Sequence, residues 1–175
     1  MAASIQFGAR TFGGAYMIPE RILAHDSRVS EVLRLIQAEF ADMDGRVDPP
    51  SSMHRLTLEA LVKEADIHEI WAMGTPIGAC VILTQMAGRL YIGKLSVAKT
   101  LRGQGLARQL IRHAEARALD MGLAVLELQT RVELVENHAT FHALGFEEHG
   151  RTAHEGYDRP TSITFQKRLS AAAKA

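Results

Sequence analysis

Apolar residues recur every three or four positions in two segments of the N-terminal half, which is the period of an amphipathic helix. The first predicted helix begins near Asp26 or Ser27, either of which could cap it, and ends by Gly45. Its predicted apolar face comprises Val29, Leu33, Ile36 and Phe40. Two prolines at positions 49 and 50 exclude a regular element directly afterwards. A second, shorter helix is expected to follow Thr57 as its cap.

Two further segments in the C-terminal half have the same helical period. The longer runs from Leu106 to Met121 and stops at Gly122. Its predicted buried positions are Leu106, Leu110, Ala114, Ala118 and Met121. A short helix over 136–144 is closed by Gly145.

Short apolar or alternating runs between these helices predict strands at 69–73, 77–84, 90–97, 123–130, from Phe146 onward, and 161–167. A short strand is also expected around 21–24. The strands of residues 69–97 form an antiparallel meander, whereas a helical crossover makes strand 123–130 parallel to its predecessor. The predicted fold is therefore α/β, with a mixed, mostly antiparallel central sheet flanked by helices. We expect a flexible N-terminal extension over 1–16, one domain over 17–170 and a tail over 171–175.

Composition narrows the class of protein. The chain has 175 residues, 47% hydrophobic and 23% charged, with a formal net charge of zero, which is typical of one globular domain. The charge balance gives no basic field for nucleic acid, and no apolar segment is long enough to cross a bilayer. The single cysteine, Cys80, lies in an apolar run and is interpreted as a buried hydrophobe. No metal site is predicted, and the expected location is cytoplasmic.

The glycine-rich stretch between strand 90–97 and the long helix is the clearest chemical signal. Gly103 and Gly105 lack a Cβ, so a bound group can approach the backbone closely. The first N–H groups of a helix have no intrahelical partners and carry partial positive charge, and Arg102 adds a full charge beside them. A phosphate or pyrophosphate fits such a site. The alternative is a strand-to-helix turn that uses glycine for geometry alone.

The loop lacks the P-loop and dinucleotide patterns. Its pattern, Arg102-x-x-Gly105-x-Ala107, resembles the acyl-CoA pyrophosphate loop of the GNAT family of N-acetyltransferases, Q/R-x-x-G-x-G/A. The strand end Leu95-x-Val97 and a short helix that closes with Gly145-Phe146 resemble two further family features. The order of predicted elements matches the family layout from about residue 18.

This resemblance implies acetyl-CoA as co-substrate and a primary amine, on a small molecule or a peptide, as acceptor, by direct attack on the thioester. It implies that the main chain at Leu95, Ser96 and Val97 pairs with the pantetheine arm. The implied pyrophosphate site comprises Arg102, Gly103, Gln104, Gly105, Leu106 and Ala107.

The chain departs from the family at the general acid. The frequent tyrosine four residues before Gly-Phe is replaced by Phe141, which has no proton to donate. His142 and Tyr157 are the alternative acids, or the thiolate leaves without one. Phe141 and Asn137, one helical turn apart, are expected to face the pantetheine arm, although Asn137 could instead cap the helix.

Several residues could serve as the general base. Glu127 is a charged residue in a mostly apolar strand, next to the expected gap between strands. His68, Glu69 and Tyr91 are alternatives, and a base acting through water need not touch the amine. The loop after the first helix and the loop before the last strand are expected to form the acceptor pocket.

Two rival functions remain open from sequence: a non-catalytic acyl-CoA-binding module and an acyltransferase for longer acyl groups. A nucleotide-binding enzyme is a weaker third. An edge strand within 146–167 could pair two subunits into a homodimer.

Overall fold

The computed structural model describes residues 17–170, so the predicted extension 1–16 and tail 171–175 lie outside the described residues. Within this part of the chain, seven strands form one sheet in the order β1-β2-β3-β4-β5-β7-β6. The strands are β1 (Glu20–Ile22), β2 (Glu69–Met73), β3 (Ala79–Met86), β4 (Arg89–Val97), β5 (Val125–Arg131), β6 (Glu147–Thr152) and β7 (Ser162–Arg168). The mixed α/β class predicted from the sequence is confirmed.

All neighbouring strands are antiparallel except β4 and β5, which are parallel. The parallel pairing joins only Leu90–Ile92 to Leu126–Leu128. The helix between these strands is the crossover that a parallel connection requires, so this prediction is confirmed. β1 and β6 are the two edges of the sheet.

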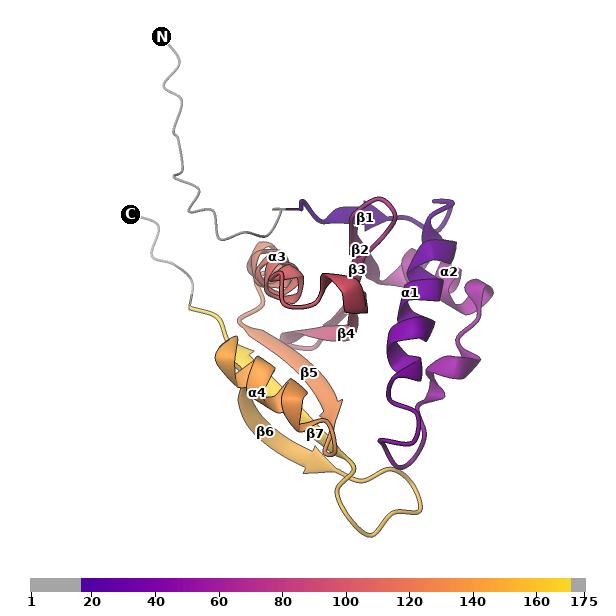
Figure 1. Cartoon of the computed structure of the whole chain (residues 1–175). Helices are drawn as coiled ribbons and strands as arrows, with labels where there is room; N and C mark the ends of the chain where they lie inside the picture. The colour runs from indigo at the N-terminus through magenta and orange to yellow at the C-terminus, as the bar shows by residue number, and fades with distance from the viewer. Residues whose placement is uncertain (1–16, 171–175) are drawn as a thin grey trace.

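Helices cover both faces of the sheet (Figure 1). α1 (Val29–Ala41) and α2 (Leu58–Ile67) pack against one face, and α3 (Leu106–Asp120) and α4 (Val135–Ala143) against the other. Two 3-10 turns, η1 (Ser52–Arg55) and η2 (Lys99–Leu101), complete the described elements. No described helix combines the length and the apolar character needed to span a bilayer.

Strand β3 explains why the core has two layers. Its residues from Ala79 to Leu83 are all buried, as expected for a strand covered on both faces. Ala79, Val81 and Leu83 pack in the cluster under α3, whereas Cys80 and Ile82 pack in the cluster under α1 and α2. The predicted burial of Cys80 is confirmed.

Helix α1 differs from the prediction in its buried face and its cap. Its buried residues are Val29, Val32, Leu35 and Ile36, and the predicted Leu33 and Phe40 are only partly buried. The helix packs against both the sheet and α2, so its buried stripe is wider than one periodic row. The N-cap position falls at Arg28 without a side-chain cap, although Asp26 accepts the Arg28 N–H at 2.8 Å. The Thr57 cap of α2 is confirmed by a 3.2 Å bond from the Ala60 N–H.

Candidate active site

A cavity of about 1140 Å³ opens where β4 and β5 diverge. Their pairing stops after Ile92 and Leu128, and beyond this point residues 95–97 of β4 and 129–131 of β5 line the cavity. A register shift opposite β4, between Cys80 and Ile82, and a positive φ of 50° at Lys94 mark the irregularity of β4 here. The divergence leaves backbone groups of β4 available to a ligand that adds as a strand.

The cavity has a wall from each half of the fold. One wall is β4 with the glycine loop and the start of α3, and the other is β5 with α4. The loop after α1 and the loop between β6 and β7, which the sequence analysis expects to form the acceptor pocket, both contribute lining residues. Of the predicted cofactor residues, the lining includes Leu95, Ser96, Val97, Arg102, Gly103, Gly105, Leu106, Ala107, Asn137 and Phe141, but not Gln104.

The glycine loop has the geometry of an anion site. Gly103 and Gly105 have φ of 77° and 82°, and a Cβ at either position would meet nothing within 4 Å. α3 begins at Leu106, and no side chain of the described residues caps its first turn. The first N–H groups of a helix have no intrahelical partners, and Gly105, Leu106 and Ala107 line the cavity, so a phosphate there could accept from them.

The charge of Arg102 is already shared with acidic residues of α1. Its guanidinium bonds Glu39 and lies 3.4 Å from Asp42. Lys99 pairs with Asp42 at 2.6 Å, and this contact, with the neighbouring arginine, lowers the pKa of Asp42. Arg102 thus fastens the loop to α1 as well as bordering the cavity, a role that the sequence does not predict.

A second arginine, Arg108, lines the cavity from the first turn of α3 and is exposed. Sequence reasoning missed it. Its position could have indicated it. A cation in the first turn of a helix is unfavourable next to the positive end of the helix dipole, so an arginine there suggests that an anion binds nearby.

Helix α4 presents Asn137 and Phe141 to the cavity, one turn apart. Asn137 is the third residue of α4 rather than its cap, and its Nδ2 donates to Thr130 Oγ1 at 3.4 Å. His142 faces elsewhere: its Nδ1 lies 3.2 Å from the Phe146 carbonyl oxygen and its ring packs edge-on against Phe165. The structure therefore brings Phe141 and Asn137 together and leaves His142 outside the lining residues.

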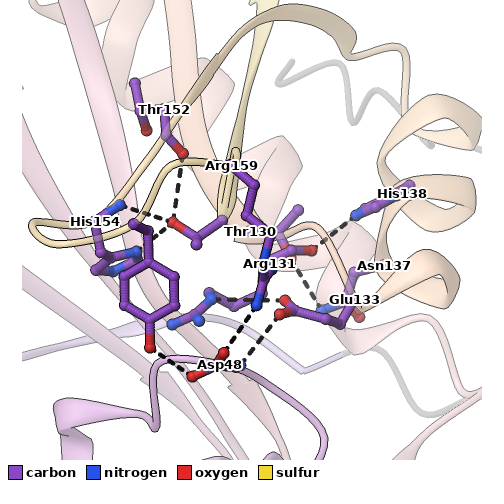
Figure 2. Close-up of polar contacts among 11 residues, drawn as sticks. Asp48, Thr130, Arg131, Glu133, Asn137, His138, Thr152, His154 and Arg159 are labelled. Carbon is purple, nitrogen blue, oxygen red and sulfur yellow. Dashed lines mark hydrogen bonds and ion pairs between the residues drawn. The ribbon is translucent and has the colours of Figure 1, made fainter.

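Tyr157 reaches the cavity from the loop between β6 and β7. Its hydroxyl donates to Asp48 Oδ1 at 2.5 Å, and Arg159 donates to Asp48 Oδ2 at 2.8 Å (Figure 2). The hydrogen bond to the Asp48 carboxylate raises the pKa of Tyr157. The hydroxyl is therefore protonated at neutral pH, and while it bonds Asp48 it is a weaker acid than a free tyrosine.

The predicted bases lie outside the cavity lining. Glu127 is buried and accepts bonds from Arg89 Nε at 3.0 Å and Gln166 Nε2 at 2.7 Å. Glu69 is held by Arg117, whose hydrogen bonds lower the Glu69 pKa to about 2. Burial, above all, raises the pKa of Tyr91. His68 is absent from the lining as well.

Other titratable groups stand on the acceptor side. His154 and Glu155 line the cavity beside Tyr157, and His154 Nδ1 lies 2.5 Å from Thr161 Oγ1. Within residues 17–170, no group of three or more His, Cys, Asp or Glu side chains is arranged to hold a metal ion.

Known structures share this architecture. The ribosomal-protein-S18-alanine N-acetyltransferase from Escherichia coli superimposes with a TM-score of 0.67 at 17% identity, over 91% of this chain and 97% of that one. The PaiA N-acetyltransferase from Thermoplasma acidophilum, solved with coenzyme A, gives 0.72 at 10% identity over 89% and 100%. An IAA acetyltransferase from Bacillus cereus gives 0.62 at 18% identity over 88% and 100%. At these identities the likeness shows the fold.

The sequence comparison carries the assignment further. No curated protein matches the chain. The model of the Acetyltransferase (GNAT) family matches residues 31–146, which include the glycine loop and the Gly145-Phe146 pair and make up most of the chain. The chain therefore belongs to the Acetyltransferase (GNAT) family.

Proposed function

We propose that this protein transfers the acetyl group of acetyl-CoA to a primary amine by direct attack of the amine on the thioester. The observation that carries the proposal is the cavity between β4 and β5, with an anion site at one end and a polar acceptor side at the other. The pyrophosphate of the cofactor needs the anion site, and its reactive thioester needs the polar side where the amine binds. The extended pantetheine arm joins these two groups.

The cofactor half of the cavity supplies binding. Backbone N–H groups at the start of α3 hold the pyrophosphate, with Arg108 adding charge. The divergent part of β4 pairs with the pantetheine arm, and Asn137 bonds an amide of the arm from the opposite wall. When bound, acetyl-CoA supplies an activated carbonyl. A backbone N–H near Val97 polarises that carbonyl, which needs no reorganisation because the donor is fixed by the strand.

The acceptor half supplies proton transfer. Tyr157 turns from Asp48 toward the cavity and protonates the leaving sulfur, in place of the tyrosine that Phe141 replaces. Proton removal from the amine runs through water toward His154 and Glu155, the titratable side chains beside it. Glu127 and His142 have no part in this proposal because neither borders the cavity.

The test is a screen of amines with acetyl-CoA, with CoA release followed by thiol titration and the acetylated product identified by mass spectrometry. We expect release to depend on both an amine and the intact loop. Tight acetyl-CoA binding without release of CoA on any amine would favour the non-catalytic binding module. The phenylalanine at position 141, where the family often has a tyrosine, is the observation that favours this rival. Faster turnover with longer acyl-CoA would favour the other rival.

Two further expectations belong to the same proposal. The edge strand β6 could pair with a second copy of the chain, although its charged residues Glu147, Glu148 and Arg151 disfavour edge pairing. Sedimentation velocity decides between monomer and dimer. A cytoplasmic location also stays a prediction, which fractionation of cells would test.

A further inference from the structure

We infer that the amine acceptor carries a carboxylate close to its amino group, as an amino acid does, and that Arg131 binds this carboxylate. This rests on the acetyl transfer proposed above. Arg131 is the last residue of β5 and lines the acceptor side of the cavity with Tyr157, His154 and Ser162. Figure 2 shows its side chain next to Glu133 and near Asp48.

Within residues 17–170, the hydrogen-bonding capacity of Arg131 is not met. Its side chain is 11% exposed, and in this part of the chain its buried Nε and Nη2 have no hydrogen-bond partner. A buried donor without a partner destabilises the protein, and more so when the group is charged. An anion that bonds these donors therefore gains free energy that the ligand-free protein lacks.

Those two nitrogens form the guanidinium edge that receives a carboxylate with two parallel bonds. The same protein uses this edge elsewhere. Arg117 Nε and Nη2 donate to the two oxygens of Glu69 at 3.0 and 2.7 Å, and Arg151 donates likewise to Glu148 at 2.6 and 3.0 Å. The unmet edge of Arg131 thus selects a group with two oxygens on one carbon.

Glu133 is the protein carboxylate nearest to this edge, yet it does not satisfy it. Its Oε2 lies 3.8 Å from Arg131 Nε, beyond hydrogen-bond distance, and is itself buried without a partner. Its Oε1 accepts the Asp48 N–H at 3.1 Å. The edge is covered in this structure, so an incoming carboxylate reaches it when the Glu133 side chain turns aside. That movement ends the 3.8 Å ion pair with Arg131 and the bond from the Asp48 N–H, and the incoming carboxylate replaces the ion pair with two direct hydrogen bonds.

The other cations on the cavity wall have less to offer a carboxylate. Arg46 pairs with Glu136, and Arg102 pairs with Glu39. Arg55 and Arg108 are exposed, so water competes for their donors. Arg131 is the guanidinium on this wall that is both mostly buried and short of partners, which makes it the specificity-determining residue.

The experiment compares free amino acids with their carboxamides as acceptors, because the pair differs at the carboxylate and keeps the amine. The wild type should use the acids at least about tenfold better in kcat/KM. Arg131→Gln should abolish this preference by raising KM for the acids about ten- to hundredfold, with KM for acetyl-CoA unchanged. Arg131→Lys should keep only part of the preference, since an ammonium lacks the paired edge. Arg151→Gln, which removes the same kind of edge from a surface pair, is the matched control and should change nothing.

A second experiment measures ligand binding to the wild-type protein, without turnover. It therefore depends neither on catalysis nor on whether a variant folds. N-acetyl amino acids should raise the melting temperature of the wild-type protein saturated with CoA, and the N-acetyl amino amides should not. Equal use of acids and amides, or a preference that survives in Arg131→Gln, would overturn the inference while leaving acetyl transfer intact. Failure to acetylate any amine, despite Arg131-dependent binding of the N-acetyl acids, would refute the transfer and keep the carboxylate site.

Discussion

Replacing Gly105 by alanine separates the backbone geometry of the loop from its role as an anion site. Gly105 has φ of 82°, and a Cβ there meets nothing within 4 Å. The cost is therefore backbone strain without a clash, about 1–2 kcal/mol for an L-residue in the left-handed region. For a chain of this length each kcal/mol lowers the melting temperature by about 2–4 °C. We expect a fall of about 2–8 °C in the ligand-free protein.

Gly105 borders the cavity, so in the proposed complex the same methyl group would crowd the pyrophosphate. Acetyl-CoA should therefore bind Gly105→Ala about tenfold more weakly, a loss of about 1.4 kcal/mol measurable by titration calorimetry. The matched control is Gly122→Ala: Gly122 has φ of 70° with equally open space, but lies at the far end of α3 away from the cavity. It should lose similar stability and no affinity. Equal affinities in the two variants would refute the assignment of the loop as the anion site.

Three further substitutions test separate parts of the account. Tyr157→Phe should lower kcat at least about tenfold with KM for acetyl-CoA unchanged, and a wild-type kcat would exclude Tyr157 as the acid. Glu69→Gln should be about 1–2 kcal/mol less stable than the wild type at neutral pH by urea denaturation. The Glu69 pKa is lowered from 4.5 to about 2, so the stability that this carboxylate gives the wild type is lost as the pH falls from 4.5 to about 2. The variant should not show this loss. Parallel plots of stability against pH for the two proteins would contradict a stabilising role of the Glu69 carboxylate. Arg102→Gln should cost about 0.5–1 kcal/mol without ligand, because it breaks the contacts with α1, and an unchanged melting temperature would show that those contacts contribute nothing.

The order of the elements and the geometry of the glycine loop could be predicted from sequence because both depend on local signals. Glycine at positions 103 and 105, directly before a helical period, specifies a turn with positive φ and an open helix start. The parallel pairing of β4 and β5 follows from the crossover helix between them. Each signal lies within a few dozen residues of the feature that it predicts.

The contacts that decide the site residues are not local, and the sequence did not predict them. Arg102 bonds Glu39 of α1, 63 residues earlier in the chain, and the Lys99 N–H at the start of η2 donates to the same carboxylate. Glu127 looked like a base from its strand position, but Arg89 and Gln166 approach it from two neighbouring strands. Arg131 is an ordinary strand-end residue in the sequence, and only the structure shows that its Nε and Nη2 are buried without hydrogen-bond partners among the described residues.

The most direct test of the central claim is the melting temperature of the wild-type protein with and without acetyl-CoA. At a hundred times its dissociation constant, a ligand of the native state adds about 2.7 kcal/mol, which is about 5–11 °C here. We expect a shift of that size for the wild type and a clearly smaller one for Gly105→Ala at the same ligand concentration. No shift of the folded wild-type protein at millimolar acetyl-CoA would contradict it.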